Sequence, residues 1–132
     1  MAYYYAKTVA RPFDEVVAAT RSSLMEEGFG VITEIDVRQI MKAKIGEEFR
    51  AYTILGACNP RMAFEALQLE NKVGIMLPCN VIVQDMGAGR TEVAAVDPVA
   101  SMAAIANDAL KEKASVIGAS LRAAIDRIDV KA

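Results

Sequence analysis

The side chains of this sequence best suited to chemistry gather in two short cysteine–asparagine elements. These elements hold both cysteines of the protein, and each one falls where a strand pattern meets a break. We therefore expect a ligand or thiol site at these two junctions, and the pattern assigns no catalytic role to any residue. The candidate site consists of Cys58, Asn59, Arg61, Pro78, Cys79 and Asn80.

Cys58 precedes the start of a predicted helix, where the helix dipole and the free amide groups favour a thiolate. Arg61, three residues further on, would add positive charge. Such a thiolate would react with oxidants, disulfides or soft metals. The alternative is a core residue, because cysteine is among the most often buried residue types. The sequence leaves both interpretations open.

A redox pair of Cys58 with Cys79 requires both junctions at the same end of a sheet and Cα atoms within about 7 Å. Antiparallel neighbouring strands would meet the first condition, whereas a parallel crossover would not. The chain has no Cys-x-x-Cys motif, so a thioredoxin-type mechanism is not indicated. Two thiols are half of a tetrahedral zinc site, which only sharing across a dimer axis would complete. We predict no metal and no cofactor.

A structural role explains the presence of one asparagine, Asn59, but not of the other, Asn80. Asn59 is a good N-cap for a helix that begins with Pro60, and capping alone accounts for it. Asn80 follows Pro78 beside a strand, where capping does not apply. Its amide would pin the backbone or line a pocket. Asn80 is therefore the more informative residue.

The composition excludes several classes of function. The 132 residues include no histidine, which removes the usual general base and the commonest metal ligand. Net charge is −2, from 15 basic and 17 acidic residues without a basic stripe, so nucleic-acid binding is not expected. Length predicts a single domain over residues 1–132. The sequence shows neither a signal peptide nor an apolar stretch able to span a membrane, so we expect a soluble, cytoplasmic protein with free thiols.

Apolar patterns with strand and helix spacing alternate along the chain. Pro12 and Gly28 bound the first helix, and Gly87 and Gly89 mark a hairpin turn. The predicted elements are a strand at 3–9, a helix at 12–27, a strand at 30–35, a short helix (alternatively a strand) at 37–44, a strand at 49–57, a helix at 60–70, and strands at 79–85 and 90–96. The side chains expected to face inward from the two shorter helices are Ile40, Met41, Ala63, Ala66 and Leu67.

One apolar stripe continues from Pro98 to Ile128. An unbroken helix of this length would measure about 46 Å, long for a domain whose radius of gyration would be near 14 Å. The helix therefore either kinks at Gly118 or packs part of its length on another subunit. We favour the second interpretation, which predicts a homodimer.

Residues 52–60, Tyr-Thr-Ile-Leu-Gly-Ala-Cys-Asn-Pro, and 77–81, Leu-Pro-Cys-Asn-Val, are similar to a known family. The chain resembles the domain-of-unknown-function family 302, small bacterial and archaeal proteins, over nearly its whole length. The resemblance implies an α+β fold of the TATA-binding-protein class. In that fold a mainly antiparallel curved sheet, in the order β-α-β(4)-α, carries its helices on one face. Helices 37–44 and 60–70 would then be short insertions, and the last helix would be long.

The same resemblance implies dimers and favours antiparallel strands on either side of helix 60–70. It implies nothing about DNA, because function lies in sites rather than in folds, and the family's biochemical role is not established.

Two hypotheses of function follow. The first is a homodimer that binds a small molecule or acts on thiols at the Cys58/Cys79 end of its sheet. The second is a non-catalytic structural or interaction module whose cysteines are core residues. A conventional hydrolase or transferase comes third, because the chain contains no histidine.

Overall fold

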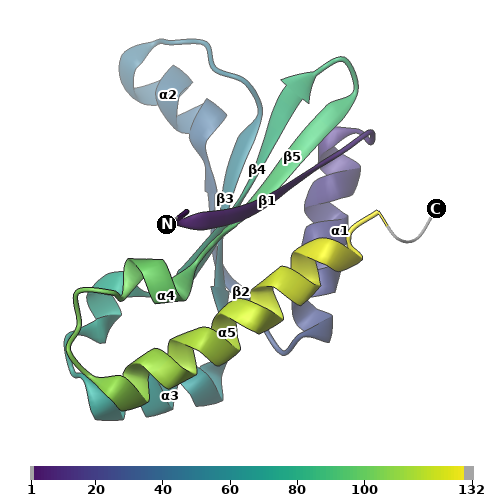
Figure 1. Cartoon of the computed structure of the whole chain (residues 1–132). Coiled ribbons are helices and arrows are strands. Elements are labelled where there is room, and N and C mark those ends of the chain that lie inside the picture. Colours follow the sequence, from purple (N-terminus) through teal and green to yellow (C-terminus); the bar gives the residue numbers. More distant parts are fainter. Residues whose placement is uncertain (1, 130–132) are drawn as a thin grey trace.

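A computed structural model describes residues 2–129 and contains one five-stranded antiparallel sheet (Figure 1). Its strands are β1 (Tyr4–Val9), β2 (Gly30–Asp36), β3 (Tyr52–Cys58), β4 (Cys79–Gly87) and β5 (Arg90–Val96). The order across the sheet is β1-β5-β4-β3-β2, and every neighbouring pair is antiparallel. The sheet does not close, so β1 and β2 are its two edges. The α+β architecture predicted from the sequence is confirmed.

The hairpin between β4 and β5 forms because its turn has the residues that a left-handed backbone needs. Gly87 and Gly89 have φ of 84° and 74°, values that glycine adopts at no steric cost. Asp85 strengthens the turn, since its Oδ1 accepts a hydrogen bond of 2.8 Å from the Gly87 amide. The predicted hairpin at residues 86–89 is therefore confirmed.

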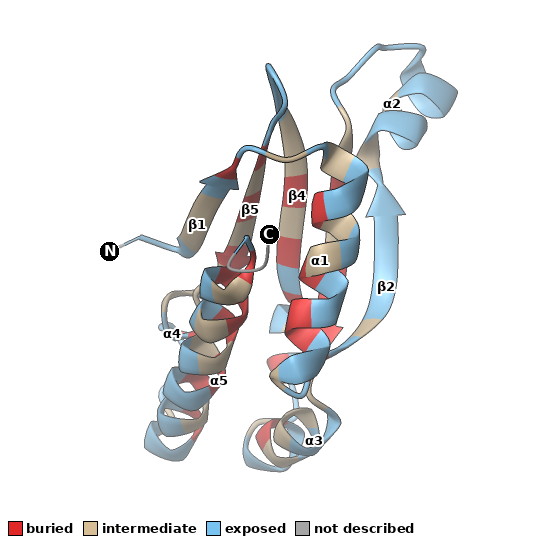
Figure 2. Ribbon diagram, turned by 90° about the vertical axis from the view of Figure 1, so that its right-hand side faces the viewer, coloured by how far each residue is buried: buried red, intermediate tan, exposed pale blue. Residues whose placement is uncertain are grey.

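Two helices cover one face of the sheet, and the others lie around its ends (Figure 2). The helices are α1 (Phe13–Glu26), α2 (Val37–Ile45), α3 (Pro60–Leu69), the 3₁₀ helix η1 (Val73–Met76), α4 (Pro98–Ser101) and α5 (Asp108–Arg127). Helices α1 and α5 are the two that pack on the sheet. If α2, α3, η1 and α4 are set aside, the order is β-α-β(4)-α, as predicted.

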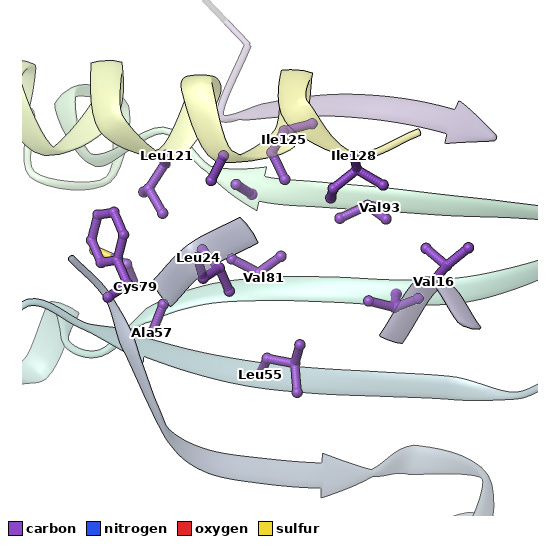
Figure 3. Packing of buried hydrophobic residues seen from close by; sticks show 14 of the residues in the cluster. Val16, Leu24, Leu55, Ala57, Cys79, Val81, Val93, Leu121, Ile125 and Ile128 are labelled. Atoms are coloured by element: carbon purple, nitrogen blue, oxygen red, sulfur yellow. The ribbon is translucent and has the colours of Figure 1, made fainter. Parts of the chain in front are cut away.

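The main core fills the space between the sheet and these two helices (Figure 3). Leu24 projects from α1 and Leu121 and Ile125 from α5, and all three are almost completely buried. They meet the inward side chains of the central strands, such as Leu55 and Val81. Each such side chain contributes about 1.5–3 kcal/mol through burial. This packing fixes α1 and α5 against the strands that carry the two cysteines.

The predicted C-terminal helix is wrong in one respect, because it breaks between Ser101 and Asp108 rather than overhanging the sheet. Asn107 restarts the helix as its N-cap, accepting a 3.0 Å hydrogen bond from the Leu110 amide. Gly118, the expected kink, lies inside α5 instead. A Cβ there would be in ordinary contact with Cδ of Pro98 at 3.5 Å, so α4 folds back against α5 at this position. Residues 2–129 therefore contain no single helix from Pro98 to Ile128, and the excess helix length on which the homodimer prediction rested is absent.

Among the five side chains predicted to face inward from α2 and α3, only Ala66 is fully buried. Ile40 is 40% exposed and no residue of α2 is buried, because α2 stands off one end of the sheet (Figure 1). In α3, Ala66 is buried as expected, but Leu67 is 42% exposed. Leu67 instead lines a cavity that opens beside α3.

Candidate functional site

The two cysteine–asparagine junctions meet at one end of the sheet. Strand β3 ends at Cys58, and its antiparallel neighbour β4 begins at Cys79. The antiparallel arrangement on either side of α3 is therefore confirmed. The register places Cys79 opposite Ala57, so the two cysteines are offset by one position. Figure 3 shows Ala57 and Cys79 beside each other at this end of the core.

An apolar cavity of about 350 Å³ lies next to this end of the sheet. It separates two hydrophobic clusters: the main core, and a smaller cluster built from α3, η1 and the start of α5. Phe29, Ala57 and Cys79 line it from the main core, and Ala66 and Leu110 from the smaller cluster. The cavity thus occupies the seam where the inserted helices meet the sheet.

The local sequence explains how α3 forms one wall. Asn59 caps this helix, since its Oδ1 accepts a 3.2 Å hydrogen bond from the Met62 amide, and Pro60 occupies the first turn. The predicted cap is confirmed. Gly28 has a left-handed φ of 87° that favours glycine, and a Cβ there would lie 3.4 Å from Nδ2 of Asn59, so the end of α1 contacts this cap. The cap therefore directs Met62, Ala63 and Leu67 along the cavity.

Gly56 explains how Pro78 reaches the same wall. A Cβ at Gly56 would lie only 2.7 Å from Cγ of Pro78 and would also collide with the Thr33 side chain. Glycine therefore lets the residues before β4 approach β3 closely. Pro78 itself precedes the first residue of β4, the position predicted for a proline without a ladder donor.

Both cysteines are free thiols. Burial, with a smaller contribution from nearby Cys58, raises the pKa of Cys79 from 9.0 to about 11. Cys79 therefore stays protonated near neutral pH, and a protonated thiol is neither the nucleophile nor the metal ligand. Cys58 is half-buried at the end of β3. The low reactivity of Cys79 weighs against the redox interpretation of this pair.

The structure brings together four of the six candidate residues. Cys58, Asn59, Pro78 and Cys79 line the cavity. The other two candidates do not. Arg61 is exposed in the first turn of α3. Asn80 lies beside Ile82 in a different, shallow depression on the open face of the sheet, because successive strand residues point to opposite faces.

Sequence reasoning missed the part of the wall that α5 supplies, namely Leu110, Lys113, Ala114 and Ile117. These positions have the spacing of one helix face. A lysine inside an otherwise apolar stripe is the signal that would have drawn attention to it.

Lys113 forms an ion pair that joins α5 to α3. Its Nζ donates a 2.6 Å hydrogen bond to Oε1 of Glu65, and the two side chains are 29% and 39% exposed. The Lys113 hydrogen bond and charge lower the pKa of the Glu65 carboxyl, and the Arg61 charge lowers it further. Glu65 is therefore ionised, bonded to Lys113 and further stabilised by the charge of Arg61.

Residues 2–129 contain no group of three or more histidine, cysteine, aspartate or glutamate side chains that could hold a metal ion. Within the same residues, none of the helices has the length and apolarity required to cross a membrane.

The fold defines an α+β protein with an open antiparallel sheet and a cavity beside its inserted helices. The sequence matches the family "Domain of unknown function DUF302" over residues 5–128, and the chain belongs to that family. It is similar to the crystal structure of an uncharacterized conserved DUF302 protein from Bacillus stearothermophilus, with a TM-score of 0.89 and 30% sequence identity. That match covers 97% of this chain and 99% of the other. No match was found among curated proteins.

Proposed function

We propose that this protein binds a small apolar molecule in the cavity at the Cys58/Cys79 end of the sheet. The observation that carries the proposal is a cavity of about 350 Å³ whose wall is apolar except for Asn59 and Lys113. Binding sites for small molecules typically measure about 300–1,000 Å³ and combine an apolar wall with a few polar groups. This cavity has the size and the chemistry of such a site.

The burial of Cys79 supports ligand binding rather than thiol chemistry as the function of this site. The Cys79 thiol is protonated at neutral pH, because burial raises its pKa to about 11. The chain also has no histidine to act as a base toward Cys58. In this proposal both cysteines serve as apolar wall residues.

A cavity-filling variant tests the proposal with octan-1-ol as a neutral probe. In two-dimensional NMR of the labelled protein, octan-1-ol should shift amide signals of α3, of the start of α5 and around Cys79. Ala63→Phe should abolish these shifts, because Ala63 lines the cavity. Ala119→Phe, at an exposed position of α5, is the matched control and should retain them.

Leu67→Trp provides a second block at a partly exposed cavity residue, in case Ala63→Phe impairs folding. Shifts spread over the whole surface, or shifts that survive both substitutions, would overturn the proposal. The cavity would then be a packing gap between two clusters.

We also propose a homodimer formed through the sheet face that α1 and α5 leave open. Tyr3, Tyr4, Tyr52 and Ile82 line one depression on this face, and Tyr3 and Tyr4 are 70% and 47% exposed. A contiguous apolar patch of this kind often marks an interaction site. Gln84 accepts a hydrogen bond from Arg50 and donates one to Glu92, so one positive and one negative charge flank it on this face. A second copy of the same face would therefore meet little repulsion in a two-fold dimer.

Sedimentation equilibrium at micromolar concentration tests the dimer. Ile82→Lys, on the open face, should give monomers, while Ala119→Lys on α5 should leave the dimer intact. A monomeric wild-type protein would refute it. We further propose a cytoplasmic location, which two free cysteines support.

A further inference from the structure

Lys113 is the one charged side chain among the residues that line the cavity. It sits in α5 between Leu110 and Ala114, both of which are buried and line the same wall. The Lys113 side chain is itself only 29% exposed. A lysine in this setting packs its methylene stem along apolar surface and presents the ammonium group at the edge. The cavity wall is therefore apolar and includes the Lys113 stem, while the ammonium group lies beside the cavity with Glu65.

The charges around Lys113 leave room for one additional anion. Glu65 pairs with Lys113 at 2.6 Å but does not line the cavity. The Arg61 charge also lowers the pKa of Glu65. Only Lys113 is bonded to Glu65, and Arg61 acts on it through its charge, so the three groups together carry a net charge of +1. An ammonium donates up to three hydrogen bonds, so Lys113 can bind a second acceptor while keeping Glu65.

The volume of the cavity sets how many atoms it can hold inside, and a longer occupant would extend through its opening. About 30 Å³ of space is needed for a water-sized group, so 350 Å³ accommodates about ten to twelve non-hydrogen atoms. A straight chain of about eight to ten carbons with a small head group has this size. A polar molecule of equal volume would find almost no hydrogen-bond partner along the wall.

We propose that the cavity binds a medium-chain amphiphile whose anionic head, a carboxylate, pairs with Lys113 while its tail lies against Cys79 and Ala66. This inference rests on the proposed function and specifies its ligand class. A carboxylate would form a charge-assisted hydrogen bond with the ammonium, the stronger kind. A cationic head would meet Lys113 and Arg61 as like charges, and a neutral head would gain no ionic partner.

Isothermal titration at neutral pH with three probes of one chain length tests the inference. Octanoate should bind at least about tenfold more tightly than octan-1-ol, a ratio that corresponds to about 1.4 kcal/mol. Octylamine should bind more weakly than both. The comparison isolates the head group, because the eight-carbon tail is common to all three probes.

Substitution of Lys113 should remove this preference without closing the cavity. Lys113→Met retains a flexible apolar stem. The affinity of this variant for octanoate should therefore fall to its affinity for octan-1-ol, which should itself be unchanged. Lys113→Arg should keep the preference and shows that the charge is responsible. Lys111→Met, at an exposed position of the same helix, is the matched control and should leave all three affinities unchanged.

The outcomes separate the inference from the function on which it rests. Equal affinity for octanoate and octan-1-ol would overturn the anionic head and leave the apolar cavity standing. Tighter binding of octylamine would overturn it in favour of Glu65 as the anchor. Failure of all three probes to bind would overturn the proposed function itself.

Discussion

Cys79 lies directly opposite Ala57 on the neighbouring strand, one position away from Cys58. Paired residues of two antiparallel strands point to the same face, and the next residue along points to the other. The Cys79 thiol therefore enters the core with Ala57, whereas Cys58 ends its strand half-buried. The offset makes the two thiols chemically different rather than a matched pair, and the predicted cysteine pair is not confirmed.

This difference predicts unequal alkylation of the two cysteines. In the native protein at pH 8, iodoacetamide should modify Cys58 at a measurable rate and leave Cys79 largely unmodified, because Cys79 is buried and 5% exposed. After unfolding in urea, both should react at similar rates. Mass spectrometry of peptides gives the two rates separately. Equal rates in the native state, or an internal disulfide after mild oxidation, would contradict the geometry.

The same burial makes stability fall at alkaline pH. The pKa of Cys79 is about 11 in the folded protein and 9.0 ordinarily, so between pH 9 and 11 the unfolded state binds fewer protons than the folded state. The free energy of unfolding therefore falls as pH rises through this range, by about 2–3 kcal/mol in total. The contribution is fully present below about pH 9.

Urea unfolding of the wild type and of Cys79→Ala at several pH values measures this effect. Lysine and tyrosine groups titrate in the same range, so the relevant quantity is the difference between the two proteins. That difference should shrink as pH rises from 9 to 11. Parallel stability curves would show that Cys79 ionises alike in both states.

The sequence predicted those features that neighbouring residues determine. The Asn59 cap, the Gly87–Gly89 turn and the edges of α1 depend on the chemistry of a few adjacent residues, and each was predicted. Antiparallel strands around α3 were predicted through the family resemblance instead. Four of the six candidate residues then fell on one cavity, since both junctions lie at one end of the sheet.

The remaining features depend on contacts between distant residues. The break before α5 is supported by Asn107, whose amide reaches Leu69 of α3, 38 positions away in the chain. The cavity is a gap between two clusters, and its α5 wall could not be placed without knowing where α5 lies. Asn80 lines a different depression for a simpler reason, because strand alternation alone turns it away from Cys79.

Gly56 should tolerate no side chain. Gly56→Ala would place a methyl group 2.7 Å from Cγ of Pro78 and against Thr33, within a buried part of β3. Overpacking of this kind costs about 1–3 kcal/mol. Gly30→Ala, on the adjacent strand, is the matched control, because its methyl group would meet only the Cys58 carbonyl oxygen at 4.0 Å. Denaturant midpoints for both variants give the comparison, and equal midpoints would refute the close packing of Pro78 on β3.

Asn107 should contribute to stability through both halves of its amide. Its Oδ1 accepts from the Leu110 amide at 3.0 Å, and its Nδ2 donates to the Leu69 carbonyl at 3.1 Å. Asn107→Ala should lower the free energy of unfolding by about 1–2 kcal/mol, as expected for a lost N-cap. Asn107→Asp keeps the cap acceptor but loses the donor to Leu69, so it should retain part of that stability.

The control for this comparison is Asp36→Ala, which removes the cap of α2. Helix α2 buries no residue, so its loss should appear as local fraying rather than as global destabilisation. Urea unfolding monitored by circular dichroism, together with amide exchange in α2 and α5, distinguishes the two effects. If Asn107→Ala left the global midpoint unchanged, as Asp36→Ala should, the link between α5 and α3 would not contribute to holding the helices around the cavity.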